Sequence, residues 1–119
     1  MHFKAAYFKT AIVLVIAVLI YSSLVPARTV EPESREHVVE ISNLRFIPKE
    51  IVVAPGDTII WVNRDFVPHT VTANDESWDS GLIEAEGRWE TVIKADMQEG
   101  YFCRYHPSMT AKLFIIRRQ

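Results

Sequence analysis

The sequence contains a single cysteine, Cys103, among its 119 residues. One thiol cannot form an internal disulfide, so the folded part must be stabilised by its apolar core or by a bound metal. An excess of basic residues is missing as well, because 13 Lys and Arg stand against 15 Asp and Glu. Proteins that bind nucleic acid usually present a basic face, so this balance argues against that class of function.

A sustained helical period is absent beyond residue 27. The chain instead contains short stretches rich in β-branched and aromatic residues, separated by turn-forming pairs such as Pro55-Gly56. The residues beyond 27 suffice for one small domain and not for two, which excludes large multidomain enzymes. We therefore predict an all-β fold, a Greek-key β-sandwich. The predicted strands lie at residues 38–41, 45–47, 50–54, 58–63, 69–73, 88–93, 101–103 and 111–117.

The N-terminal residues have the three parts of a secretory signal peptide. Lys4 and Lys9 give a basic start without acids, residues 11–24 are almost continuously apolar, and small residues follow at 25–27. A cleavable signal segment is therefore predicted at residues 1–27.

An uncleaved membrane anchor remains the alternative, although the apolar run is short for a bilayer span of about 20 residues. Either segment would export the domain, which we expect to be periplasmic or extracytoplasmic. The domain would be soluble after cleavage or tethered by residues 11–25. Residues 28–36 are charged, contain a proline and are predicted to be a tether, followed by the globular domain at 37–119.

One short motif carries the chemistry. Cys103 is followed by His106 three residues later and by Met109 three residues after that, and His69 lies well upstream at the start of a predicted strand. Histidine and methionine account for 4 and 3 residues of the chain, so chance would place both at these spacings roughly once in a thousand. One thiolate, two imidazoles and one thioether are the ligands of a blue-copper electron-transfer site. We therefore predict one type 1 copper ion, held at one end of the sandwich.

Simpler interpretations of these residues stay open. A lone cysteine in a β-sandwich is often just a small buried hydrophobe, and an apolar-flanked histidine such as His69 can be a core residue with satisfied hydrogen bonds. A cysteine with two histidines also suits zinc, which would give a colourless and redox-silent protein. Met97 precedes Cys103 without a returning loop, so we expect it to fill space rather than to bind metal.

This part of the chain resembles the cupredoxins, and most closely the amicyanin and plastocyanin branch. The resemblance covers nearly all of residues 37–118, and the short Cys-x-x-His-x-x-Met loop is similar to that of amicyanin. The matching pieces, besides that loop, are Phe46-Ile47-Pro48, Val53 to Thr58, Trp61 to Asp65, His69 to Thr72 and Asp79-Ser80-Gly81.

The resemblance implies a copper-binding Greek-key sandwich that carries single electrons. It also implies binding through the Nδ1 atoms of both histidines, and a solvent-facing edge of His106 within an apolar patch, where we expect Pro68, Pro107 and Met109. Many members have an asparagine directly after the first ligand histidine, and this chain has Thr70. A hydroxyl and an amide differ as hydrogen-bond partners, so the support of the first ligand is expected to differ as well.

The expected function is that of an electron carrier and not of an enzyme, because no acid/base pair suggests catalysis. In amicyanin-like systems the donor is an amine dehydrogenase and the acceptor a cytochrome, so redox proteins are the expected partners of what we expect to be a monomer. A copper chaperone or storage module using the same ligands is the alternative function. A metal-free interaction domain is a third.

Overall fold

The computed structural model describes residues 26–118, so the apolar part of the predicted signal or anchor segment lies outside the described residues. The described residues contain no helix, so they include no helix that is long and apolar enough to cross a membrane. A compact unit at Pro32–Gln119 holds all the strands.

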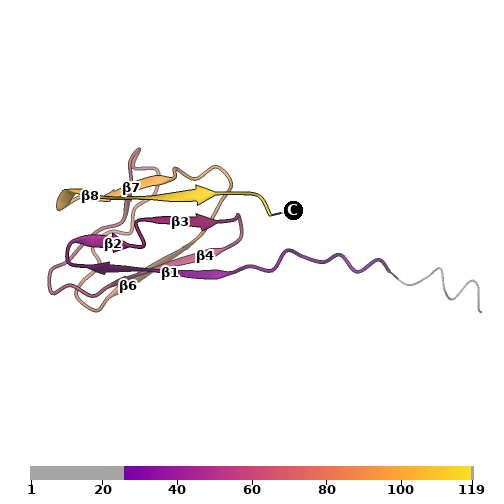
Figure 1. Ribbon diagram of the computed structural model, residues 1–119, viewed down its shortest axis with the longest axis horizontal. Coiled ribbons are helices and arrows are strands. Elements are labelled where there is room, and N and C mark those ends of the chain that lie inside the picture. Colours follow the sequence, from indigo (N-terminus) through magenta and orange to yellow (C-terminus); the bar gives the residue numbers. More distant parts are fainter. Residues whose placement is uncertain (1–25, 119) are drawn as a thin grey trace, which may run out of the picture. The chain divides into compact units, whose positions relative to one another are not determined.

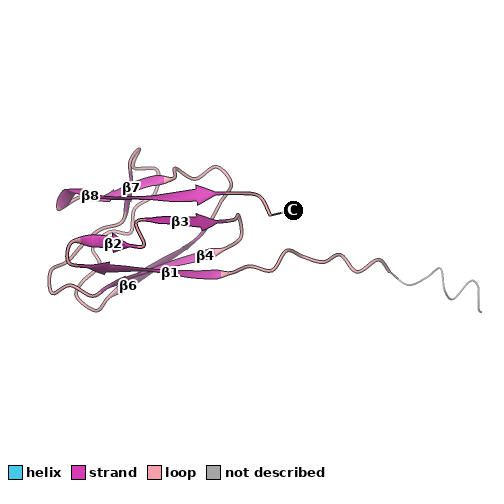
Figure 2. Ribbon diagram, in the orientation of Figure 1, coloured by secondary structure: helices cyan, strands magenta, loops and turns pink. Residues whose placement is uncertain are grey.

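Within the described residues, eight strands form two four-stranded sheets (Figures 1 and 2). The strands are β1 (Glu36–Ser42), β2 (Arg45–Ile47), β3 (Glu50–Val53), β4 (Thr58–Asn63), β5 (Thr72–Ala73), β6 (Arg88–Val92), β7 (Gly100–Cys103) and β8 (His106–Ile115). The orders are β2-β1-β4-β6 and β3-β8-β7-β5, so the chain passes between the sheets at every connection from β2 to β7. The pairs β1–β4 and β3–β8 are parallel and the others antiparallel. The all-β prediction is confirmed.

Side chains from both sheets fill the core between the layers. Val39 and Trp61 from the first sheet and Tyr101 and Leu113 from the second are all 0% exposed and belong to one apolar cluster. The Trp61 indole donates to the Tyr101 hydroxyl at 3.3 Å, which joins the sheets. Burial raises the pKa of the Tyr101 phenol to about 12, although the hydrogen bond from Trp61 acts in the other direction. Both aromatic residues are therefore packing residues of the core.

Two of the predicted strands differ from the observed ones. The strand predicted at 69–73 is reduced to β5, and His69 makes only an isolated bridge with Ile83. The strand predicted at 111–117 begins earlier, because β8 already starts at His106. Both differences lie next to His69 and His106. The strand limits there depend on contacts between distant segments, which a local β pattern cannot predict.

Asp57 joins both ends of the domain at the pole where β1 begins and β8 ends. Its side chain is 0% exposed and accepts from the backbone N–H groups of Arg35 and Ala54, from Arg118, and from Nε2 of His37 at 2.8 Å. Burial by itself would raise the pKa of Asp57, but these hydrogen bonds outweigh it and hold the pKa well below its usual range. The buried carboxylate therefore connects the segment before β1 to the C-terminal segment.

We expect the unfolding free energy to depend on pH through Asp57. A depressed carboxyl pKa contributes stability above the unfolded value of about 3.9, and this stability is lost as pH falls toward the folded value. Asp57→Asn should lower the unfolding free energy by about 2–3 kcal/mol at pH 7 and by progressively less below pH 4. Urea unfolding from pH 7 to 3 measures this, with the exposed Asp96→Asn as control. A constant difference across that range would contradict the expectation.

Candidate metal centre

Three of the four predicted ligands meet at the pole opposite Asp57. His69, Cys103 and His106 each offer one ligand atom, and these atoms lie within 4.8 Å of one another. The Cys103 Sγ atom lies 3.6 Å from Nδ1 of His69 and 3.8 Å from Nδ1 of His106. Residues 34 positions apart in the chain thus contribute to one centre, which the sequence motif alone could not place.

The separations fit a shared metal ion. Three donors at about 2.0–2.3 Å from a common centre, spread near a plane, lie roughly 3.5–4 Å apart. The observed 3.6 and 3.8 Å from the sulfur to the two imidazole nitrogens fall in this range. His69 and Cys103 are 0% exposed, whereas His106 is half-buried. The donor set of one thiol and two imidazoles, turned toward one point, suits copper or zinc.

The connection between β7 and β8 positions two of these side chains. Cys103 ends β7 and is the register partner of His106, which begins β8 after a tight turn. The next register pair is Phe102 with Thr110, so residues 107–109 have no partner on β7 and bulge out of the ladder. The bulge lets β8 begin at the metal centre and still continue as a regular strand toward the other pole.

Asp65 orients the remaining histidine. Nε2 of His69 lies 2.8 Å from an oxygen of Asp65, whose carboxylate also accepts from the backbone N–H groups of Asn43 and Leu44. Burial would raise the pKa of Asp65, but the N–H of Leu44, the His69 ring and the N–H of Asn43 together lower it. An ionised carboxylate can only accept, so Nε2 of His69 carries the proton and Nδ1 presents its lone pair to the centre.

Asp65 has a second effect on the turn between β1 and β2. Asn43 and Leu44 have φ angles of 52° and 57°, a left-handed conformation that is costly for leucine. The two N–H groups donated to Asp65 hold this turn in place. The carboxylate thus connects the hairpin turn to the histidine, a role that no local sequence pattern indicates.

Asp65→Asn should weaken metal binding. The amide has one accepting oxygen for the three donors now held by the carboxylate, and it removes the negative charge that keeps the proton on Nε2 and makes the imidazole a stronger ligand. We expect copper affinity to fall by about 10–100-fold, measured by competition with a chelator of known affinity. Asp75→Asn, which removes an exposed carboxylate, is the control. Equal copper affinities for the two variants would show that Asp65 does not set the tautomer.

Thr70 stands where the resemblance led us to expect an asparagine, and it bridges the two ligand segments. Its backbone N–H donates to the Cys103 sulfur at 3.4 Å, and its hydroxyl accepts from the backbone N–H of Arg104 at 2.9 Å. The side chain is only 3% exposed. A hydroxyl therefore makes a cross-link from the segment of His69 to the segment of Cys103.

Met109 lies within the bulge of β8. The predicted strand at residues 111–117 would instead have placed it before the strand. It is 5% exposed and shares the core cluster with Cys103, so its expected place on the apolar surface patch is wrong. The bulge turns this side chain inward. Of the other two residues expected there, Pro107 is exposed beside His106 and Pro68 is half-buried beside His69. Phe66, at 101%, and Tyr105, at 59%, are exposed apolar residues of the segments that carry the two histidines.

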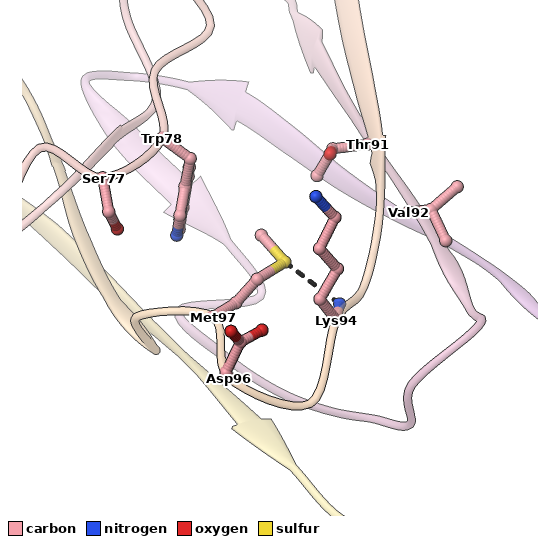
Figure 3. A pocket seen from close by; sticks show the side chains of 7 residues that line it. All are labelled: Ser77, Trp78, Thr91, Val92, Lys94, Asp96 and Met97. Carbon is pink, nitrogen blue, oxygen red and sulfur yellow. Dashed lines mark hydrogen bonds between the residues drawn. The ribbon is translucent and has the colours of Figure 1, made fainter.

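A separate hollow of about 220 Å³ lies beside Trp78 (Figure 3). Its lining residues are Ser77, Trp78, Thr91, Val92, Lys94, Asp96 and Met97. The sulfur of Met97 accepts from the backbone N–H of Lys94 at 3.2 Å, so this methionine belongs to a turn away from the three donors. The prediction that Met97 fills space agrees with its packing against the core cluster.

The comparison with known proteins agrees with this site. A family model described as copper binding proteins of the plastocyanin/azurin family matches residues 34–116. The chain is similar to amicyanin from Paracoccus versutus, with 23% identity over 83 residues, and to amicyanin from Paracoccus denitrificans, with 25% identity over 83 residues. Each alignment covers 66% of this chain and 63% of the relative, so the chain spans under two thirds of the length of these relatives.

Solved structures give the same result for the fold. An amicyanin variant in its Cu(I) form aligns with a TM-score of 0.61 and 26% identity, over 76% of this chain and 95% of that one. A copper-containing nitrite reductase from Thermus scotoductus aligns with a TM-score of 0.61 over 80% of this chain and 25% of that one. The second alignment has 19% identity and therefore indicates only a common fold.

Proposed function

Because the chain belongs to the plastocyanin/azurin family of copper-binding proteins, we propose that it carries single electrons on one type 1 copper ion. The observation that supports this most directly is the convergence of a buried thiol with two imidazole Nδ1 atoms, all within 4.8 Å. Bound copper would alternate between Cu(II) and Cu(I) and so take up or release one electron.

We assign the ligands to His69, Cys103, His106 and Met109. The first three would supply the thiolate and the two imidazoles that bind copper strongly, and Met109 would add a weaker thioether ligand. Support for Met109 comes from its burial in β8, three residues beyond His106 and in the same core cluster as Cys103. The surrounding β-sandwich and the hydrogen bonds to Asp65 and Thr70 would keep these side chains in place while the charge on the metal changes.

The edge of His106 would be the place where electrons enter and leave. This ring is half-buried, whereas His69 is fully buried, so His106 is the ligand nearer to solvent. Phe66 and Tyr105 offer exposed apolar surface for transient docking. By analogy with the amicyanins, the partners would be a donor dehydrogenase and a cytochrome-type acceptor. The protein itself would not be an enzyme.

Export is part of the proposal. The predicted signal or anchor segment at residues 1–27 would place the domain in a periplasmic or other extracytoplasmic compartment, either soluble or tethered. A small monomeric carrier suits such a location, since it can move or swing between larger redox partners.

Copper handling is the second candidate, a module that binds Cu(I) and passes it on. Such a role needs ligands that a partner can reach. Two of the three donors here are 0% exposed, which favours retention of the ion over transfer.

A visible absorption spectrum tests the proposed function. The purified full-length protein, kept in mild detergent because of its apolar N-terminal residues, is loaded with Cu(II) and then reduced with ascorbate. We expect an intense blue thiolate-to-copper band that disappears on reduction and returns on oxidation. Copper bound in a mass spectrum without such a band would favour copper handling, and no binding at all would refute both functions.

A further inference from the structure

Arg104 directly follows the proposed cysteine ligand. Its backbone and its side chain both belong to one ring of hydrogen bonds. Its backbone N–H donates to the Thr70 hydroxyl at 2.9 Å, and that hydroxyl lies 3.0 Å from the hydroxyl of Thr72. Thr72 in turn donates to Oδ1 of Asp79 at 3.3 Å, and Oδ2 of Asp79 accepts from Nε of Arg104 at 2.9 Å. The path therefore begins at the backbone of Arg104 and returns to its side chain.

The hydrogen-bond direction around this ring is determined by charge. Burial would raise the pKa of Asp79, but the Gly81 N–H, Arg104 and Thr72 outweigh it and lower the pKa, so the group is a carboxylate that only accepts. Thr72 must therefore donate to Asp79 and accept from Thr70. The Thr70 oxygen is then free to accept from the N–H of Arg104, and every donor in the ring has one acceptor.

The two threonines at the centre of the ring are buried. Thr70 is 3% exposed and Thr72 is 0% exposed, so neither hydroxyl has water as an easy substitute partner. The guanidinium is 42% exposed and also contacts Glu76 at 2.7 Å. An exposed ion pair adds little stability by itself. The effect of Arg104 must therefore lie in the geometry it imposes on the buried part of the ring.

We propose that Arg104 is a positioning residue that locks the cysteine ligand to the histidine ligand across the two segments, through Asp79, Thr72 and Thr70. The locked Thr70 N–H keeps its 3.4 Å contact with the Cys103 sulfur. A hydrogen bond to the sulfur stabilises negative charge there and therefore favours Cu(I) over Cu(II). This inference rests on the proposed function, but the geometry it describes also exists without metal.

Three substitutions distinguish a positioning effect of the ring from a direct effect of charge on the reduction potential. Arg104→Gln removes a positive charge, Asp79→Asn removes a negative charge, and Thr72→Val removes only a hydroxyl. Charge alone would shift the reduction potential in opposite directions for the first two and leave the third unchanged. If the ring positions the ligand, all three lower the ratio of Cu(I) to Cu(II) affinity, by up to roughly tenfold or about 59 mV.

Redox titration of the copper-loaded variants measures this, with Arg88→Gln as the matched control. Arg88 is paired with Glu90 on β6 at 2.6 Å, so its loss removes the same charge from an exposed ion pair that is not part of the ring. Combining Arg104→Gln with Asp79→Asn should give no larger shift than either alone, because both break the same bond. A rise in potential for Asp79→Asn with no change for Thr72→Val would overturn the proposal.

A second readout needs no copper. The Cys103 thiol is 0% exposed, so alkylation by iodoacetamide requires the ligand segments to open. In the metal-free full-length protein, the three ring variants should react about threefold faster or more, and Arg88→Gln should react like the wild type. Faster alkylation in a protein that forms no blue site would support the ring and refute the proposed function. Unchanged alkylation in all three variants would overturn the ring whether or not copper binds.

Discussion

Cys103→Ser is expected to abolish the blue colour completely. The colour would arise from charge transfer between a thiolate sulfur and Cu(II), and a serine hydroxyl is not deprotonated at neutral pH. The substitution changes volume little at a fully buried position, so the β-sandwich should remain folded. Absorption and electron paramagnetic resonance spectra of the copper-loaded variant measure the effect, and competition titration measures the remaining affinity.

Met97→Leu is the matched control for this substitution. It also removes a sulfur, but from the turn beside the hollow, where the sulfur accepts from the N–H of Lys94. We expect this variant to keep its blue band and its copper affinity. A blue band that persists in Cys103→Ser would show that the colour does not come from a thiolate, because the chain has no other cysteine. A band lost in Met97→Leu would show that Met97 also contributes to the copper site.

The proposed ligand residues were accessible to sequence reasoning because three of them form one local motif. Cys103, His106 and Met109 are spaced by a short loop, and loop spacing is visible in a sequence without any knowledge of the fold. His69 was assigned as the remaining partner of suitable type, and the structure places its Nδ1 atom 3.6 Å from the sulfur. Fold class was equally accessible, since short β-rich stretches recur along the chain without a helical period.

The residues that support the ligands were not accessible in this way. Asp65 acts through backbone groups 21 and 22 positions away, and Arg104 acts through Asp79, 25 positions away. Such contacts depend on which strands pair and where they end. The burial of Met109 was missed for a related reason, because a bulge in β8 turns it inward although its neighbours in the sequence are exposed.

Asn63 shows how the fold brings the first histidine to the site. It ends β4 and is 0% exposed, and its amide N–H₂ lies within hydrogen-bonding distance of the carbonyls of Val67, Ile83 and Glu84 at 2.9–3.2 Å. Its side-chain oxygen accepts from the backbone N–H of Asp65. One side chain therefore holds the loop that leads from β4 to His69 and joins it to the segment that precedes β6.

Asn63→Ala should be the most destabilising of the substitutions considered. It leaves the Val67 carbonyl and the Asp65 N–H without a partner, each worth about 1–3 kcal/mol. It also removes a second hydrogen bond from the Ile83 and Glu84 carbonyls and opens a cavity at a fully buried position. We expect the unfolding free energy of the metal-free protein to fall by about 3 kcal/mol or more, measured by urea unfolding. Asn74→Ala, at an exposed loop position, is the control and should change the unfolding free energy by less than about 0.5 kcal/mol.

Copper added in excess should restore part of the stability of Asn63→Ala, because the ion binds only the folded site. If copper stabilises the variant by as much as it stabilises the wild type at the same concentration, Asn63 acts mainly through the fold and leaves the ligand geometry intact. If copper restores little, the loop held by Asn63 is what positions His69, and stability and metal affinity are lost through the same contacts.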